Sequence, residues 1–223
     1  MNKLGFLGLG SYSTLYYIQQ LNEQYQSQKG GYSTCPFLML NADFDTINPH
    51  LPDQFERLQQ ALLPYLQVFE QSNIKQLLVP NITLHQVLDQ LWRTQKYSFE
   101  LLHPLALAAQ ALRKQNTKTV IVLATAYTMQ SDYISNFLHA YGVELLTPTA
   151  SQIEQADQLR TTIYEQGIST KVQEDWQLLL ATVADNVGIL LACTELCMLT
   201  TTRVHVYNLA QLQLAAALDS LSI

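Results

Sequence analysis

The feature that most constrains the fold is the alternation, along the whole chain, of short apolar runs with longer segments of helical periodicity. This pattern is typical of α/β proteins, in which helical crossovers join parallel strands. The sequence therefore predicts mainly parallel sheets flanked by helices. The expected strands span Leu4–Gly8, Phe37–Asn41, Gln76–Val79, Thr119–Ala124, Val143–Leu146, Val187–Ala192 and Val204–Tyr207. The expected helices span Thr14–Gln28, Asp53–Ser72, Leu84–Thr94, Pro104–Asn116, Ser131–Tyr141, Ser151–Gln166, Lys171–Asn186 and Ala210–Ser220.

Two stretches of the chain repeat one pattern. "LLVPNITLH" (Leu77–His85) and "ILLACTELC" (Ile189–Cys197) both read as an apolar strand, a small turn, polar residues and a leucine. Each follows another strand with a polar turn, "FLGLGSYST" (Phe6–Thr14) or "VLATAYTM" (Val122–Met129). A loose repeat also arises from any pair of parallel strand ends, but the pattern favours two pseudosymmetric lobes with an active-site cleft between them. The expected lobes comprise residues 1–101 with 208–223, and residues 102–207.

The repeat also suggests where a ligand binds. In open parallel sheets, ligands lie beyond the carboxyl ends of the strands. Asn81 and Cys193 hold equivalent places in the repeat and are expected to face each other across the cleft. Helices that begin just after them would aim backbone N–H groups at an anion, which predicts a site for a small carboxylate. The hydroxyl groups expected beside them belong to Thr83, Thr125 and Thr194.

Composition and charge exclude several classes of partner. The net charge is −6, only 13% of residues are charged, and no Lys/Arg stripe is present, which argues against nucleic-acid binding. No apolar run reaches the ~20 residues that cross a bilayer. The start, "MNKLGFLGLG", leads into a strand without the pattern of a signal peptide. We therefore expect a cytoplasmic protein without a membrane partner.

The three cysteines, Cys35, Cys193 and Cys197, show no disulfide framework and are expected to be free thiols. Cys197 follows Cys193 by one helical turn without a clear histidine partner, so core packing is favoured over zinc binding and no metal site is predicted. Taken alone, Cys193 also fits a small buried residue. The "GLG" at Gly8–Gly10 is too short for a dinucleotide loop.

Four motifs, in order and spread over nearly the whole chain, resemble those of the aspartate/glutamate racemase family, within the group that includes hydantoin racemases. They are "GFLGLGSYSTLYY" (Gly5–Tyr17), "ADF" (Ala42–Phe44), "LATAYTMQSDY" (Leu123–Tyr133) and "ACTEL" (Ala192–Leu196). The resemblance implies a two-lobed homodimer without a cofactor, acting on a small acidic amino acid.

The resemblance also implies a chemical role for Cys193. Enzymes of this family are similar in using two cysteines, one from each lobe, on opposite faces of the substrate α-carbon. Cys193 matches the second. Asn81 stands at the position of the first, in "NITLH", which resembles C-N-T-x-H. An amide does not exchange protons as a thiol does, so Cys193 is expected to be the single remaining base and to serve the L substrate.

Other positions receive roles from the same resemblance. His85 and Asn208 are expected to support the site, although His85 also fits a histidine that packs and hydrogen-bonds locally. Asn81 likewise fits a simple helix cap. The resemblance implies substrate-binding roles for Ser11, Thr14, Thr83, Thr125, Thr194 and Glu195.

Several departures from the family pattern concern substrate recognition. Asn208 and Gln213 stand for an aspartate and a histidine near the C-terminus. The basic residues that hold the substrate have no clear match, since His50 and Arg57 are poorly placed and Lys171 falls late. Two hypotheses follow: a racemase-like protein with reduced turnover, or an inactive relative that binds a small anion or has a regulatory role.

Overall fold

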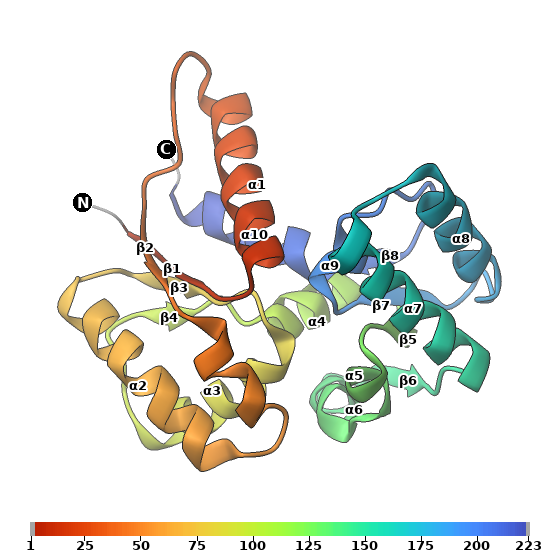
Figure 1. Ribbon diagram of the computed structural model, residues 1–223, viewed down its shortest axis with the longest axis horizontal. Coiled ribbons are helices and arrows are strands. Elements are labelled where there is room, and N and C mark those ends of the chain that lie inside the picture. Colours follow the sequence, from red (N-terminus) through yellow and green to blue (C-terminus); the bar gives the residue numbers. More distant parts are fainter. Residues whose placement is uncertain (1–2, 222–223) are drawn as a thin grey trace. The chain divides into compact units, whose positions relative to one another are not determined.

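The computed structural model describes residues 3–221 as two units, each built on a four-stranded parallel sheet (Figure 1). One unit runs through His103 and resumes at Gln213, and the other spans Pro104–Leu212. The sequence places these boundaries after residues 101 and 207. The predicted fold class, α/β with two parallel sheets flanked by helices, is confirmed.

The sheet of the first unit has the strand order β2-β1-β3-β4. Adjacent strands run parallel throughout, so their carboxyl ends share one edge. The central strand packs closely at Gly5, where a Cβ atom would lie 2.5 Å from Cδ1 of Ile74 and 3.0 Å from a ring carbon of Phe69, so a larger residue would displace these buried side chains. The strands are β1 (Leu4–Gly8), β2 (Phe37–Asn41), β3 (Gln76–Leu78) and β4 (Glu100–Leu101).

Helices cover this sheet. The helix α2 turns an apolar stripe at helical spacing inward, with Leu58, Leu62, Leu66 and Phe69 fully buried, and packs against α3. The helix α3 follows β3 in the chain. The helices are α1 (Ser11–Lys29), α2 (Phe55–Gln71) and α3 (Ile82–Thr94), with short 3₁₀ turns η1 (Phe44–Thr46) and η2 (Asn48–His50). The division between units falls within α10 (Leu209–Ser220).

The sheet of the second unit has the order β6-β5-β7-β8, which repeats the order of the first unit with the numbers shifted by four. Its strands are also parallel. In each unit, the first and third strands in chain order lie side by side at the centre of the sheet. The residues that follow these two strands therefore lie at the middle of the carboxyl edge. The strands are β5 (Thr119–Leu123), β6 (Glu144–Leu146), β7 (Gly188–Leu191) and β8 (Val206–Asn208).

The longest helix of the second unit, α7, begins with a capping box. The Thr149 hydroxyl accepts from the backbone N–H of Gln152 at 3.2 Å, and Oε1 of Gln152 accepts from the backbone N–H of Thr149 at 2.9 Å. The helix packs against α5, α8 and α9. The helices are α4 (Pro104–Lys114), α5 (Ala126–Gln130), α6 (Asp132–His139), α7 (Ala150–Gln166), α8 (Thr170–Ala181) and α9 (Thr194–Cys197).

The elements that the sequence analysis did not predict are short. They are β4, α5 and the two 3₁₀ turns, none longer than five residues. A segment of this length does not complete enough periods for its pattern to be read. Within residues 3–221, no helix combines the length and the apolar character that spanning a bilayer requires.

Candidate active site

The carboxyl edge of the second sheet brings Thr125 and Cys193 together. Leu123 of β5 pairs with Leu191 of β7, and the backbone N–H of Ala192 donates to the carbonyl of Leu123 at 3.1 Å. Thr125 and Cys193 each lie two residues beyond this pair. They therefore occupy equivalent places just beyond the ends of two neighbouring strands.

The Cys193 thiol donates to a carboxylate. Its Sγ lies 2.8 Å from Oε2 of Glu195, and the cysteine is buried. Burial, followed by the negative charge of Glu195 and its hydrogen bond, raises the pKa of Cys193 well above its ordinary value of 9.0, although the backbone N–H of Glu195 acts in the opposite direction. The thiol therefore holds its proton at neutral pH and donates it in the hydrogen bond to Glu195.

The helix that follows Cys193 corrects one sequence-based expectation. The sequence predicted that a helix beginning near Glu195 would turn its positive end toward an anion. The helix α9 has only four residues, and Cys193 makes no side-chain cap bond to it. A single turn sums few peptide dipoles, so it does not provide the predicted anion site.

Two threonines lie at the same edge of the sheet as the thiol. Thr194 follows Cys193 in the chain, and Thr125 follows the neighbouring strand β5. The Thr125 hydroxyl caps α5: it accepts from the backbone N–H of Thr128 at 3.2 Å and lies 2.9 Å from the Thr128 hydroxyl. Thr194 is the first residue of α9 and is partly exposed. A hydroxyl residue thus follows each central strand, Thr125 after β5 and Thr194 directly after Cys193.

Cys197 and Asn208 hold the short helix α9 in place. The Cys197 thiol donates to the carbonyl of Leu191 at 3.5 Å, and burial raises its pKa to about 12. Nδ2 of Asn208 donates to the carbonyl of Cys197 at 2.8 Å, and its Oδ1 accepts from the backbone N–H of Gln211 at 3.0 Å. Among residues 3–221, no group of three His, Cys, Asp or Glu side chains is arranged to hold a metal ion.

In the first unit, Asn81 caps α3. Its Oδ1 accepts from the backbone N–H of Leu84 at 3.0 Å, and its own N–H donates to the carbonyl of Val79 at 3.0 Å. Its carbonyl accepts from Nδ1 of His85 at 2.8 Å. The amide of Asn81 is therefore used to start a helix, as the alternative interpretation of this residue proposed.

His85 is fully buried beside a second histidine. Its ring packs edge-on against that of His103 with centroids 4.9 Å apart, and Nε2 of His103 lies 3.2 Å from Oδ1 of Asp89. Burial, followed by the charge of His103, lowers the pKa of His85 to about 3. Because Nδ1 faces a carbonyl, the neutral ring donates there and holds the backbone of Asn81.

The neutral state of His85 predicts acid sensitivity. Its pKa is about 3 when folded and 6.5 when unfolded, so stability that is present above pH 6.5 is lost as the pH falls toward 3. Between pH 7 and pH 5 the free energy of unfolding should fall by ~2 kcal/mol through this group alone. Urea unfolding of the wild type and His85→Gln at both pH values measures this loss. Equal pH dependence in the two proteins contradicts it.

The other three hydroxyl residues of the first unit that are predicted to bind substrate lie in the first turns of helices. Thr14 is buried in α1, and its hydroxyl accepts from the backbone N–H of Leu9 at 3.0 Å, which joins α1 to the loop after β1. Ser11 begins α1 and is exposed. Thr83 lies in the first turn of α3 and is partly exposed.

Gln213 braces the loops of the first unit from α10. Its Oε1 accepts from the Tyr17 hydroxyl at 2.7 Å, and its Nε2 donates to the carbonyls of Leu102 at 2.7 Å and Val79 at 3.3 Å. Gln213 and Tyr17 are each only 2% exposed. Gln213, for which the family resemblance implies a histidine, therefore has a structural role in this chain. It binds the carbonyl of Val79, two residues before Asn81.

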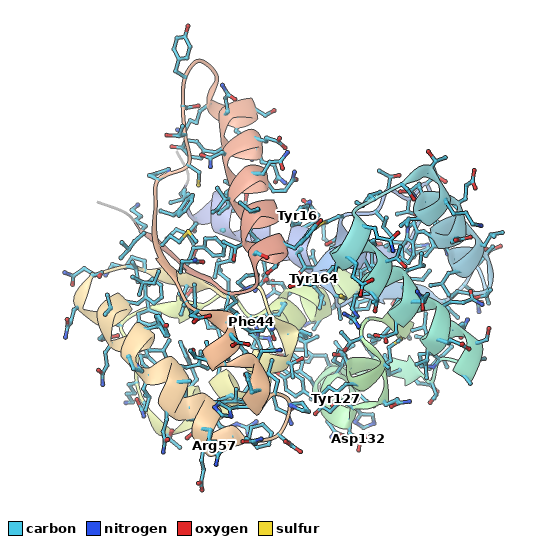
Figure 2. The ribbon with its side chains drawn as sticks, in the orientation of Figure 1. Tyr16, Phe44, Arg57, Tyr127, Asp132 and Tyr164 are labelled. Carbon is cyan, nitrogen blue, oxygen red and sulfur yellow. The ribbon has the colours of Figure 1, made fainter. Side chains whose placement is uncertain are left out.

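The basic residues considered from the sequence lie at the surface. Arg57 is exposed on α2 (Figure 2). Lys171 pairs with Asp175 at 2.7 Å on α8, and Nδ1 of His50 lies 3.2 Å from Oε1 of Gln54. These contacts are local, within four residues of each side chain.

One polar pair, on α7, was not among the residues predicted from the sequence. Oδ1 of Asp157 accepts from the backbone N–H of Ala126 at 3.2 Å and from Nε of Arg160 at 3.0 Å. The i,i+3 spacing of the two side chains could have indicated the ion pair. The contact with α5 depends on tertiary packing, which no local pattern reveals.

The fold and the two central strand ends define a class of α/β protein built from two like sheets, with Asn81 following β3 and Cys193 following β7. The family model described as Asp/Glu/Hydantoin racemase matches residues 6–213, and the chain belongs to this family. A comparison with proteins of curated function gave no significant match.

Solved structures of racemases and their homologues share the fold. A candidate Asp/Glu racemase from Yersinia pestis is 24% identical with a TM-score of 0.80, and an aspartate racemase homologue from Pyrococcus horikoshii is 20% identical with a TM-score of 0.83; each comparison covers 99% of both chains. An aspartate racemase from Picrophilus torridus is 19% identical with a TM-score of 0.73, covering 98% of this chain and 94% of that one.

Proposed function

We propose that this protein carries out cofactor-independent α-proton chemistry on a small acidic amino acid, with Cys193 as the group that exchanges the proton. The observation that carries the proposal is the 2.8 Å contact between the Cys193 thiol and the Glu195 carboxylate beyond the carboxyl end of β7. Membership in the Asp/Glu/hydantoin racemase family supports an amino acid as the substrate.

In this proposal Glu195 is the acceptor that makes the thiol a base. The thiol proton moves from Sγ to Oε2, which leaves a thiolate and a neutral carboxylic acid. The thiolate then takes the α-proton, and the electron pair of the broken C–H bond moves toward the substrate carboxylate. The donors that we assign to stabilising charge at this edge are the backbone N–H of Glu195 and the hydroxyls of Thr125, which follows β5, and Thr194, which follows Cys193.

The proposed chemistry is one-sided. Return of a solvent-derived proton from Cys193 restores the same isomer, and water serves the opposite face, where the family uses a second thiol. The L-isomer of aspartate or glutamate should therefore exchange its α-proton in deuterated buffer faster than the D-isomer, as followed by NMR. Equal rates for the two isomers would overturn the single-base proposal.

A second candidate function is binding of a small anion without turnover. Two observations favour it: the side-chain oxygen of Asn81 accepts the hydrogen bond that caps α3, and burial beside Glu195 keeps Cys193 protonated. Calorimetric binding of L-aspartate without any α-proton exchange would support this candidate over the first.

Replacement of Glu195 by glutamine tests the proposed relay. Removing the carboxylate removes two of the causes that raise the pKa of Cys193, so that pKa should fall toward 9.0. Ultraviolet absorbance of the thiolate should then appear at lower pH than in the wild type. Exchange at pH 7 should nevertheless fall by ~10²-fold, because the proton acceptor is lost. A variant with unchanged thiol titration and unchanged exchange would rule the relay out.

A further inference from the structure

The Asp157–Arg160 pair on α7 is tied to the edge of the second sheet. Oδ1 of Asp157 accepts both from the backbone N–H of Ala126, the first residue of α5, and from Nε of Arg160. One carboxylate oxygen thus holds the start of α5 and the guanidinium together. The position of Arg160 is therefore set by α5 as well as by its own helix.

The same edge carries the thiol. Ala126 follows Thr125, which occupies the place on β5 equivalent to that of Cys193 on β7. The helix α7 packs against both α5 and α9, the two helices that begin after these strands (Figure 1). A residue of α7 that contacts the first turn of α5 therefore lies at the end of the sheet where Cys193 and Glu195 lie.

The guanidinium of Arg160 retains donors for a ligand. Its Nε donates to Asp157, and Nη2 donates to the Thr161 hydroxyl at 3.1 Å. Within residues 3–221, Nη1 has no hydrogen-bond partner, and the side chain is 28% exposed. The Nε side of the guanidinium is held by Asp157, whereas Nη1 and the second N–H of Nη2 point along its outer end. Two parallel N–H groups at this end match the two oxygens of a second carboxylate.

The other cations of the second unit are used elsewhere. Arg203 donates to the carbonyls of Leu180 and Ala184, which precede β7, and Lys171 pairs with Asp175 on the surface of α8. The remaining lysine and arginine residues of this unit precede the strand β5 and so lie toward its amino end. They are Arg113, Lys114 and Lys118.

We propose that Arg160 binds a carboxylate group of the substrate and supplies the positive charge for which the sequence offered no clear match. The assignment rests on the proposed function, because it requires an acidic amino acid at this edge. Asp157 positions the guanidinium, and Nη1 with the outer N–H of Nη2 faces the ligand. Asp157 and Glu195 carry the opposing charges of this edge: Asp157 accepts from Arg160, and Glu195 accepts from the Cys193 thiol.

Titration calorimetry with L-aspartate, L-asparagine and L-alanine tests this role in the whole protein. Arg160→Gln should weaken L-aspartate binding by ~10-fold or more, the loss expected for one charged hydrogen-bonded contact. Arg160→Lys should recover part of the affinity, since it keeps the charge without the fork. Lys171→Gln is the matched control, because it removes one positive charge of the same unit from a surface pair.

The three ligands identify the carboxylate. A loss confined to L-aspartate assigns the side-chain carboxylate, and an equal loss for all three assigns the α-carboxylate. Unchanged binding to folded Arg160→Gln, together with normal α-proton exchange, overturns the role of Arg160 and leaves the proposed function standing. Absence of both binding and exchange in the wild type overturns the two together. Thermal unfolding of each variant separates lost affinity from lost fold.

Discussion

Replacement of Cys193 by alanine should reduce α-proton exchange of L-aspartate by ~10³-fold, the usual contribution of one positioned acid or base. The reason is that the thiol next to Glu195 is the group in the second unit that is both hydrogen-bonded to a proton acceptor and placed beyond the central strands. NMR in deuterated buffer measures the loss of the α-proton signal directly.

Cys197→Ala provides the matched control for that experiment. Cys197 is a buried thiol one helical turn away, and it donates to a main-chain carbonyl instead of a carboxylate. This variant should keep the exchange rate of the wild type. Retained exchange in Cys193→Ala, or equal losses in the two variants, would show that the chemistry does not depend on the Cys193–Glu195 pair.

The largest effect on stability should come from Gln213→Leu. Leucine is similar in size but leaves the Leu102 carbonyl and the Tyr17 hydroxyl without the partners that Gln213 supplies in a buried site. The free energy of unfolding should fall by ~3 kcal/mol, because unsatisfied buried polar groups cost 1–3 kcal/mol each. Urea unfolding monitored by circular dichroism measures the change.

A double-mutant cycle separates the hydrogen bond from the packing. Tyr17→Phe alone removes the hydroxyl, and Tyr17→Phe combined with Gln213→Leu replaces both partners by apolar groups. The double variant should lose less stability than the sum of the two single losses. Strict additivity would show that Tyr17 and Gln213 do not depend on each other.

The sequence predicted the fold well because the fold depends on periodic patterns. The strands β1 and β2 have the expected bounds, and α7 differs by one residue at its start, since apolar periodicity and the Thr149 cap mark these elements locally. The edge strand β4 has two residues and leaves no such mark. The repeated strand order follows from the repeated motifs, but its register depends on long-range pairing.

The candidate site was predicted less completely, because its decisive contacts are tertiary or depend on side-chain conformation. The motifs indicated Cys193 and Glu195, but not that the carboxylate accepts from the thiol. Gln213 meets Tyr17 across 196 positions of sequence, which no local pattern reveals. Asp157 reaches α5 from a different helix in the same way.

The two residues that precede α3 and α9 illustrate a trade-off between stability and activity. Asn81 caps its helix through Oδ1, whereas Cys193 occupies the same place before α9 and makes no cap bond. A thiol caps a helix poorly, and a cap residue such as asparagine or serine typically contributes ~1 kcal/mol at a helix start. The first unit therefore has the more stable helix start, at the position for which the family resemblance implies a first cysteine. The second unit forgoes that stabilisation and has at the same place the thiol to which we assign proton exchange in the proposed function.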